Sequence, residues 1–145
     1  MRTKYVFLYL ILILFYSACS NAQNSKEIWN EKQLMPPSEL AKIINDSTIK
    51  SPYIFSIGPA GFIKNAIDVS DAMDKNGIEK FQKILEKLPE DADIVIYCGC
   101  CPFDVCPNIR PSFKLLNKMK FTNHKLLNLP KNLKVDWIDK GYPMN

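Results

Sequence analysis

The run ADIVIYC at residues 92–98 restricts the fold more than any other part of the sequence. It is almost continuously apolar and rich in Ile and Val, which is typical of a strand buried on both faces. Shorter segments with strand character lie at residues 51–58, 65–72 and 124–129. Amphipathic segments with helical spacing lie at residues 36–46, 77–91, 111–121 and 132–141. This alternation predicts an α/β fold, a three-layer sandwich of helices around a mainly parallel sheet.

Residues 1–18 have the organisation of an export signal. Arg2 and Lys4 precede an uncharged apolar run at residues 5–16, and small residues then lead to Cys19. The sequence YSAC resembles the lipobox of bacterial lipoproteins, which implies lipidation of Cys19 and attachment to a membrane. Ordinary cleavage after Ala22 is the alternative, and an uncleaved anchor is a third, for which the apolar run is short. All three predict a domain that works outside the cytoplasm, in the cell envelope or periplasm.

The rest of the chain reads as a polar tether at residues 19–33 followed by one domain at residues 34–145. The composition, 47% hydrophobic and 23% charged, is that of a globular protein. The formal charge of +4 includes the two basic residues of the export signal, and without residues 1–18 it is +2. Basic and acidic residues are interleaved, so we expect no nucleic-acid partner.

Four of the five cysteines lie at or just after the end of the apolar strand at residues 92–98, namely Cys98, Cys100, Cys101 and Cys106. The carboxyl end of an interior parallel strand is where α/β sheets place ligands and catalytic groups. Backbone N–H groups of the loop and the N-terminus of the next helix would stabilise a thiolate there and lower its pKa. Cys98 is therefore the candidate nucleophile.

The last third of the chain has a distinctive order of features. They are a strand ending in Tyr97 and Cys98, then Arg110, a helix ending in KF at residues 120–121, and Trp137 before KGYP at residues 140–143. Through these features the chain resembles a rhodanese domain, over about residues 34–144 and most closely in the last third. The resemblance implies a rhodanese-like fold and a sulfurtransferase that carries sulfane sulfur on Cys98 as a persulfide. Its partners would be a small sulfur donor and a thiol acceptor, with no cofactor. Arg110 and loop amides such as that of Gly99 would bind the substrate charge.

The loop between Cys98 and Arg110 is longer than in typical rhodanese domains and leaves other interpretations open. Cys100, Cys101 and Cys106 are candidate resolving or auxiliary thiols. Alternatively, the spacing of Cys98, Cys101 and Cys106 is that of a thiolate site for Zn or Cu. A third possibility is a catalytically inactive rhodanese-like binding domain in which the cysteines form structural disulfides. The single histidine, His124, is expected at the surface or at a strand end, and Trp137 in the core.

Overall fold

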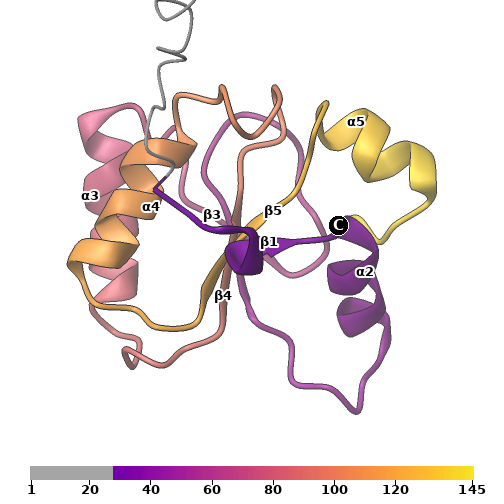
Figure 1. The fold of residues 1–145 in the computed structure, drawn as a ribbon, viewed down its shortest axis with the longest axis horizontal. Coiled ribbons are helices and arrows are strands. Elements are labelled where there is room, and N and C mark those ends of the chain that lie inside the picture. Colours follow the sequence, from indigo (N-terminus) through magenta and orange to yellow (C-terminus); the bar gives the residue numbers. More distant parts are fainter. Residues whose placement is uncertain (1–27) are drawn as a thin grey trace, which may run out of the picture.

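The computed structural model describes residues 28–145, so the predicted export signal, Cys19 and most of the predicted tether lie outside the described residues. The chain forms a three-layer α/β sandwich around a five-stranded, all-parallel sheet of order β1-β5-β4-β2-β3 (Figure 1). The strands are β1 (Leu34–Met35), β2 (Tyr53–Ser56), β3 (Ala66–Asp68), β4 (Ile94–Tyr97) and β5 (His124–Leu127). The predicted fold class is confirmed.

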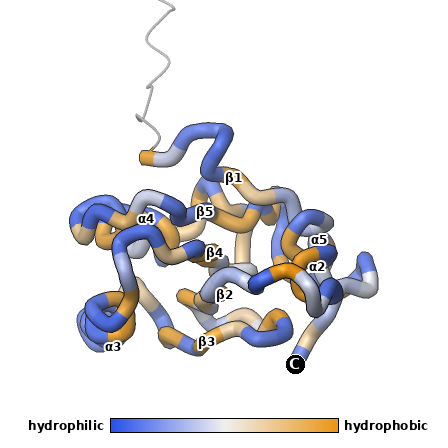
Figure 2. The backbone as a smooth tube through the Cα atoms, turned by 90° about the horizontal axis from the view of Figure 1, so that it is seen from below, coloured by the Kyte–Doolittle hydropathy of each residue, from blue (hydrophilic) through white to orange (hydrophobic). Residues whose placement is uncertain are grey.

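Helices cover both faces of the sheet. Helices α3 and α4 lie on one face, and α2 and α5 lie on the other (Figures 1 and 2). Their bounds are α2 (Pro37–Asn45), α3 (Lys75–Leu85), α4 (Ile109–Lys118) and α5 (Leu133–Asp136), with short 3-10 helices η1 (Glu31–Gln33) and η2 (Ile138–Lys140). Within residues 28–145, no helix has the length and hydropathy needed to cross a bilayer. Strand β1 and helix η1 were not predicted, because two or three residues are too few to show a periodic pattern.

Strand β4 lies at the centre of the sheet, between β2 and β5, and contributes to two cores. Ile94, Ile96 and Cys98 face the core beneath α3 and α4. Val95 and Tyr97 face the core beneath α2 and α5. This alternation explains the continuous apolar run, because both faces of the strand are covered. It also places Cys98 at the carboxyl end of β4, on the side of α3 and α4.

The described part of the predicted tether packs against the domain. Trp29 is only 4% exposed, and its ring centroid lies 6.1 Å from that of Phe103 and 5.6 Å from that of Phe113. Asn30 caps helix η1, with its side chain accepting a hydrogen bond from the Lys32 N–H. The folded unit therefore begins before Leu34, earlier than expected. A single tryptophan in a polar segment has no periodicity that would predict its burial.

Trp137 and His124 are both buried in the sandwich. Trp137 is fully buried, as predicted, and its Nε1 donates a hydrogen bond to the Pro143 carbonyl at 3.1 Å. His124 begins β5, but it is 4% exposed and so does not lie at the surface. Its ring packs against Phe113, its Nδ1 lies 3.0 Å from the Phe121 carbonyl oxygen, and burial lowers its pKa. Both residues serve the packing of the sandwich.

Candidate thiol site at the end of strand β4

The chain turns sharply after Cys98 because Gly99 has a left-handed backbone conformation, with φ of 81°. The Gly99 carbonyl accepts a hydrogen bond from the Leu133 N–H at 2.8 Å. A β-carbon on residue 99 would lie 2.8 Å from Cβ of Leu133 and 3.1 Å from Cβ of Ala60. Gly99, predicted to bind substrate, thus has a clear conformational role. Because it has no side chain, the turn after β4 can pass close to the start of α5.

This turn brings three sulfur atoms together. Cys98 Sγ lies 3.2 Å from Cys100 Sγ, and the sulfur atoms of Cys98, Cys100 and Cys106 all lie within 4.8 Å of one another. We call these three residues the sulfur cluster. Cys98 and Cys106 are buried, Cys100 is exposed, and all three are free thiols rather than disulfides. The site therefore combines a protected sulfur with an exposed one in direct contact.

Cys101 occupies a different position from the one expected for a metal ligand. Its Sγ lies 3.4 Å from Cys100 Sγ, but the sulfur cluster contains Cys100 where the spacing of the sequence favoured Cys101. Cys101 instead packs at the edge of the core beneath α3 and α4. Sequence spacing could not predict that Cys100 would take this place, because the direction of each side chain depends on the turn at Gly99.

Asn108, the residue before α4, is the main polar side chain beside Cys98. It is 3% exposed, and its Nδ2 donates a hydrogen bond to Cys98 Sγ at 3.5 Å. Its Oδ1 accepts a hydrogen bond from the Met73 N–H at 2.7 Å, which fixes the amide with its NH₂ group toward the sulfur. Sequence reasoning did not assign Asn108 this role, since its partner Met73 is far away along the chain.

Hydrogen-bond donors around Cys98 favour its thiolate. The Cys106 thiol has the largest effect, and the Asn108 amide and the N–H and thiol of Cys100 add to it. Together they outweigh the opposing effect of burial and lower the pKa of Cys98 to about 5. Partial desolvation, together with its sulfur neighbours, raises the pKa of Cys100 to about 12, and the contact with Cys98 raises the pKa of Cys106. At neutral pH the cluster thus holds one thiolate and two thiols that can donate to it.

The Arg110 side chain, predicted to bind substrate, contacts Trp29 and the Asp104 carbonyl. Its guanidinium carbon lies 5.1 Å from the centroid of the Trp29 ring, a cation–π contact, and its Nη2 donates a hydrogen bond to the Asp104 carbonyl at 3.3 Å. The polar groups that the structure places against the Cys98 sulfur come from Asn108 and the cysteines. Arg110 therefore links the loop to the segment that precedes β1.

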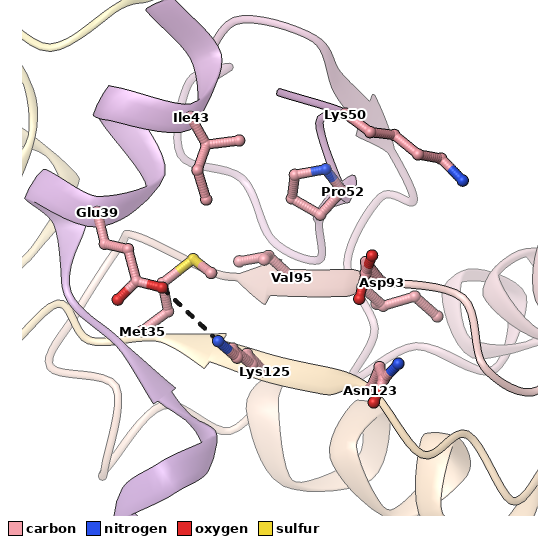
Figure 3. A pocket seen from close by; sticks show the side chains of 10 residues that line it. Met35, Glu39, Ile43, Lys50, Pro52, Asp93, Val95, Asn123 and Lys125 are labelled. Atoms are coloured by element: carbon pink, nitrogen blue, oxygen red, sulfur yellow. Dashed lines mark ion pairs between the residues drawn. The ribbon is translucent and has the colours of Figure 1, made fainter. Parts of the chain in front are cut away.

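A separate pocket of about 210 Å³ lies near the amino ends of β4 and β5, at the opposite edge of the sheet (Figure 3). Met35, Ile43 and Val95 form its apolar wall, and Glu39 and Lys125 form an ion pair of 3.7 Å across it. Both members of that pair are substantially exposed, and neither is a strong nucleophile. The cysteine whose pKa is lowered, Cys98, lies instead at the carboxyl edge.

Comparison with protein-family models, with curated proteins and with solved structures found no match to this chain. The parallel α/β sandwich and the position of the sulfur cluster after the central strand are compatible with a rhodanese-like domain. The cluster is also compatible with the binding of a metal ion. Function has to be inferred from the chemistry of the site itself.

Proposed function

We propose that this chain is an exported, rhodanese-like sulfurtransferase that carries sulfane sulfur on Cys98. The observation that supports this most directly is the set of donors around the Cys98 sulfur, which lowers its pKa to about 5 and makes it a thiolate at neutral pH. A thiolate is the form that attacks sulfur. Its location at the carboxyl end of the central strand agrees with the resemblance of the sequence to rhodanese domains.

The reaction has two displacements at sulfur. In the first, the Cys98 thiolate attacks the outer sulfur of a small donor such as a persulfide. The donor's sulfur–sulfur bond breaks, the donor leaves as a thiolate with the bonding electron pair, and Cys98 becomes a persulfide. In the second, an acceptor thiolate attacks the outer sulfur of the Cys98 persulfide. The bond between the two sulfurs of that persulfide breaks, the acceptor becomes a persulfide, and the Cys98 thiolate is regenerated. No net oxidation or reduction occurs.

The burial of Cys98 restricts which donors can react. Cys98 is 1% exposed, and its contact with solvent is limited by the loop that contains the exposed Cys100. The reacting sulfur of a donor must therefore project from the rest of the donor to reach Cys98, as the terminal sulfur of a persulfide does. Asn108 and the Cys106 thiol can also hydrogen-bond the sulfur while its charge is displaced toward the new bond.

Consumption of a sulfane sulfur donor tests this proposal. The full-length protein would be mixed with one equivalent of glutathione persulfide, and the glutathione released would be measured over time. We expect release to be slowed by about a hundredfold or more in Cys98→Ser, because the variant lacks the thiolate that attacks the donor. Cys101→Ser, a change in the same loop but outside the sulfur cluster, serves as the matched control and should retain fast release. Equal rates in wild type and Cys98→Ser would refute Cys98 as the sulfur carrier.

A second function, the binding of a soft metal ion, is favoured by the sulfur cluster itself. Three sulfurs bound at about 2.3 Å to one ion in a trigonal plane lie about 4.0 Å apart. The three sulfurs of Cys98, Cys100 and Cys106 all lie within 4.8 Å of one another, so they would have to draw together by no more than about 0.8 Å. Three thiolates match the preference of Cu(I) for soft ligands, whereas structural Zn would need a fourth ligand.

Metal titration separates this second function from the first. Under reducing conditions, Cu(I) would be titrated against a chelator into the full-length protein and into Cys106→Ser and Cys101→Ser. A metal site predicts one tightly bound ion per chain, lost in Cys106→Ser and kept in Cys101→Ser. Equal, weak binding by all three proteins would exclude it.

A further inference from the structure

Among the neighbours of Cys98, the Cys100 sulfur is the one placed for covalent bonding. The two sulfur atoms are 3.2 Å apart, and a disulfide has a bond of about 2.05 Å, so closure requires a movement of only about 1 Å. Gly99, the single residue between them, has no side chain and already adopts φ of 81°, which turns the two cysteines toward each other. Cys106 meets Cys98 from a distant part of the loop and is buried.

We propose that Cys100 resolves the persulfide on Cys98 and releases the carried sulfur as hydrosulfide. This inference rests on the proposed function, since it begins from the Cys98 persulfide. The Cys100 thiol loses its proton, its sulfur attacks Sγ of Cys98, and the bond between Cys98 Sγ and the carried sulfur breaks. The carried sulfur leaves with the electron pair and takes up a proton. A disulfide between Cys98 and Cys100 has then formed, so the two cysteines are oxidised and the carried sulfur is reduced.

The different exposure of Cys98 and Cys100 suits the step that reduces their disulfide and regenerates the two thiols. A dithiol reductant would regenerate the protein by attacking the exposed Cys100 sulfur, displacing the buried Cys98 as a thiolate and then closing its own disulfide. The net reaction converts one sulfane sulfur and one dithiol into hydrosulfide and one disulfide. The protein would thereby act as a sulfane-sulfur reductase, in addition to passing sulfur to an acceptor.

Proximity gives Cys100 an advantage over any thiol in solution. A group held in contact with its target reacts as though it were present at a very high concentration. Cys101 shares the loop and the chemistry of Cys100, but its sulfur lies against that of Cys100, at 3.4 Å, and it is outside the sulfur cluster. Replacing Cys101 therefore provides a matched comparison for replacing Cys100.

The test is a single turnover with reduced full-length protein and one equivalent of glutathione persulfide, without added reductant. Hydrosulfide, free thiols and intact mass would be measured together. Wild type and Cys101→Ser should each release about one hydrosulfide per chain and lose two thiols. Cys100→Ser should retain one extra sulfur atom that a reductant removes, and its hydrosulfide release should be slower by about a hundredfold.

The outcomes separate this inference from the proposed function. If Cys100→Ser, shown to be folded by circular dichroism, releases hydrosulfide as fast as wild type, Cys100 is not the resolving thiol. The same conclusion follows if wild type keeps its persulfide, although sulfur carriage on Cys98 would then stand. If folded wild-type protein neither takes up sulfur nor releases hydrosulfide, both the sulfur carrier and its resolution are wrong.

Discussion

Gly58 packs directly against Cys98, and a β-carbon on residue 58 would overlap the Cys98 sulfur and lie 3.0 Å from Nδ2 of Asn108. The loop after β2 thus forms one wall of the thiolate site. A side chain at position 58 could be accommodated only by displacing Cys98, Asn108 or the backbone between them. The absence of a side chain at residue 58 is therefore a requirement of the sulfur site.

We expect Gly58→Ala to move the Cys98 sulfur away from its donors. Overpacking of this kind costs about 1–3 kcal/mol, and the free energy of unfolding measured in urea should fall by that amount. Gly61→Ala is the control, because its new β-carbon would meet only Cε of Met144 at 3.6 Å, an ordinary contact. Equal free energies of unfolding for the two variants would show that the loop around Gly58 moves to accept a side chain without loss of stability.

Asn108→Asp tests the hydrogen bond to Cys98. The substitution keeps an oxygen acceptor for the Met73 N–H but replaces the NH₂ donor near Cys98 with a negatively charged oxygen. In wild type the Cys98 thiolate predominates above a pH of about 5 and is lost as the pH falls through that value. The rate of donor consumption should therefore be constant near neutral pH and fall in acid. In Asn108→Asp this fall should occur at a higher pH, because the pKa of Cys98 rises.

Ultraviolet absorbance of the thiolate, followed as a function of pH and corrected with Cys98→Ser, measures this change. Ser112→Ala is a suitable control, since it removes a hydrogen bond of 2.9 Å to the main-chain carbonyl of Asn108 but leaves the side-chain amide in place. An identical titration curve for Asn108→Asp and wild type would mean that Asn108 does not stabilise the thiolate.

Two glycines with positive φ should respond differently to alanine. Gly141, at the end of η2, has φ of 70° and nothing within 4 Å of a β-carbon, so Gly141→Ala should cost about 1 kcal/mol from backbone strain. Gly99→Ala adds a close contact with Leu133 Cβ and should cost about 2–4 kcal/mol. Chemical denaturation of both variants would measure the difference. Equal costs would show that Leu133 moves aside freely.

Trp29→Ala tests the unexpected extension of the domain. Removing a buried aromatic ring should lower the free energy of unfolding by about 3–5 kcal/mol. Loss of the ring should also remove the cation–π partner of Arg110. Since Arg110 joins the cysteine loop to Trp29, that loop should become less well held. Glu31→Ala, an exposed change in the same segment, should alter stability by no more than about 0.5 kcal/mol. If Trp29→Ala is as stable as Glu31→Ala, this segment does not contribute to the stability of the domain and is a tether, as the sequence predicted.

Much of the fold could be predicted because its signals are local. The apolar run at residues 92–98 became β4 with both faces buried, and the segment at residues 111–121 became α4 with an earlier start, at Ile109. Helical periodicity and continuous apolar runs reflect which side of each element meets a core, so they are visible in a few consecutive residues. The same reasoning placed Cys98 at the carboxyl end of the central strand.

The sequence by itself determined an alternating α/β chain with four cysteines clustered after its most apolar strand. Only the tertiary structure decided which of them meet: Cys100 rather than Cys101 joins Cys98 and Cys106, because Gly99 turns the chain. It also brought Asn108 and Gly58 to Cys98 and turned Arg110 toward Trp29. These contacts join residues from separate segments, and their side-chain directions are fixed by packing among several elements, which no local pattern encodes.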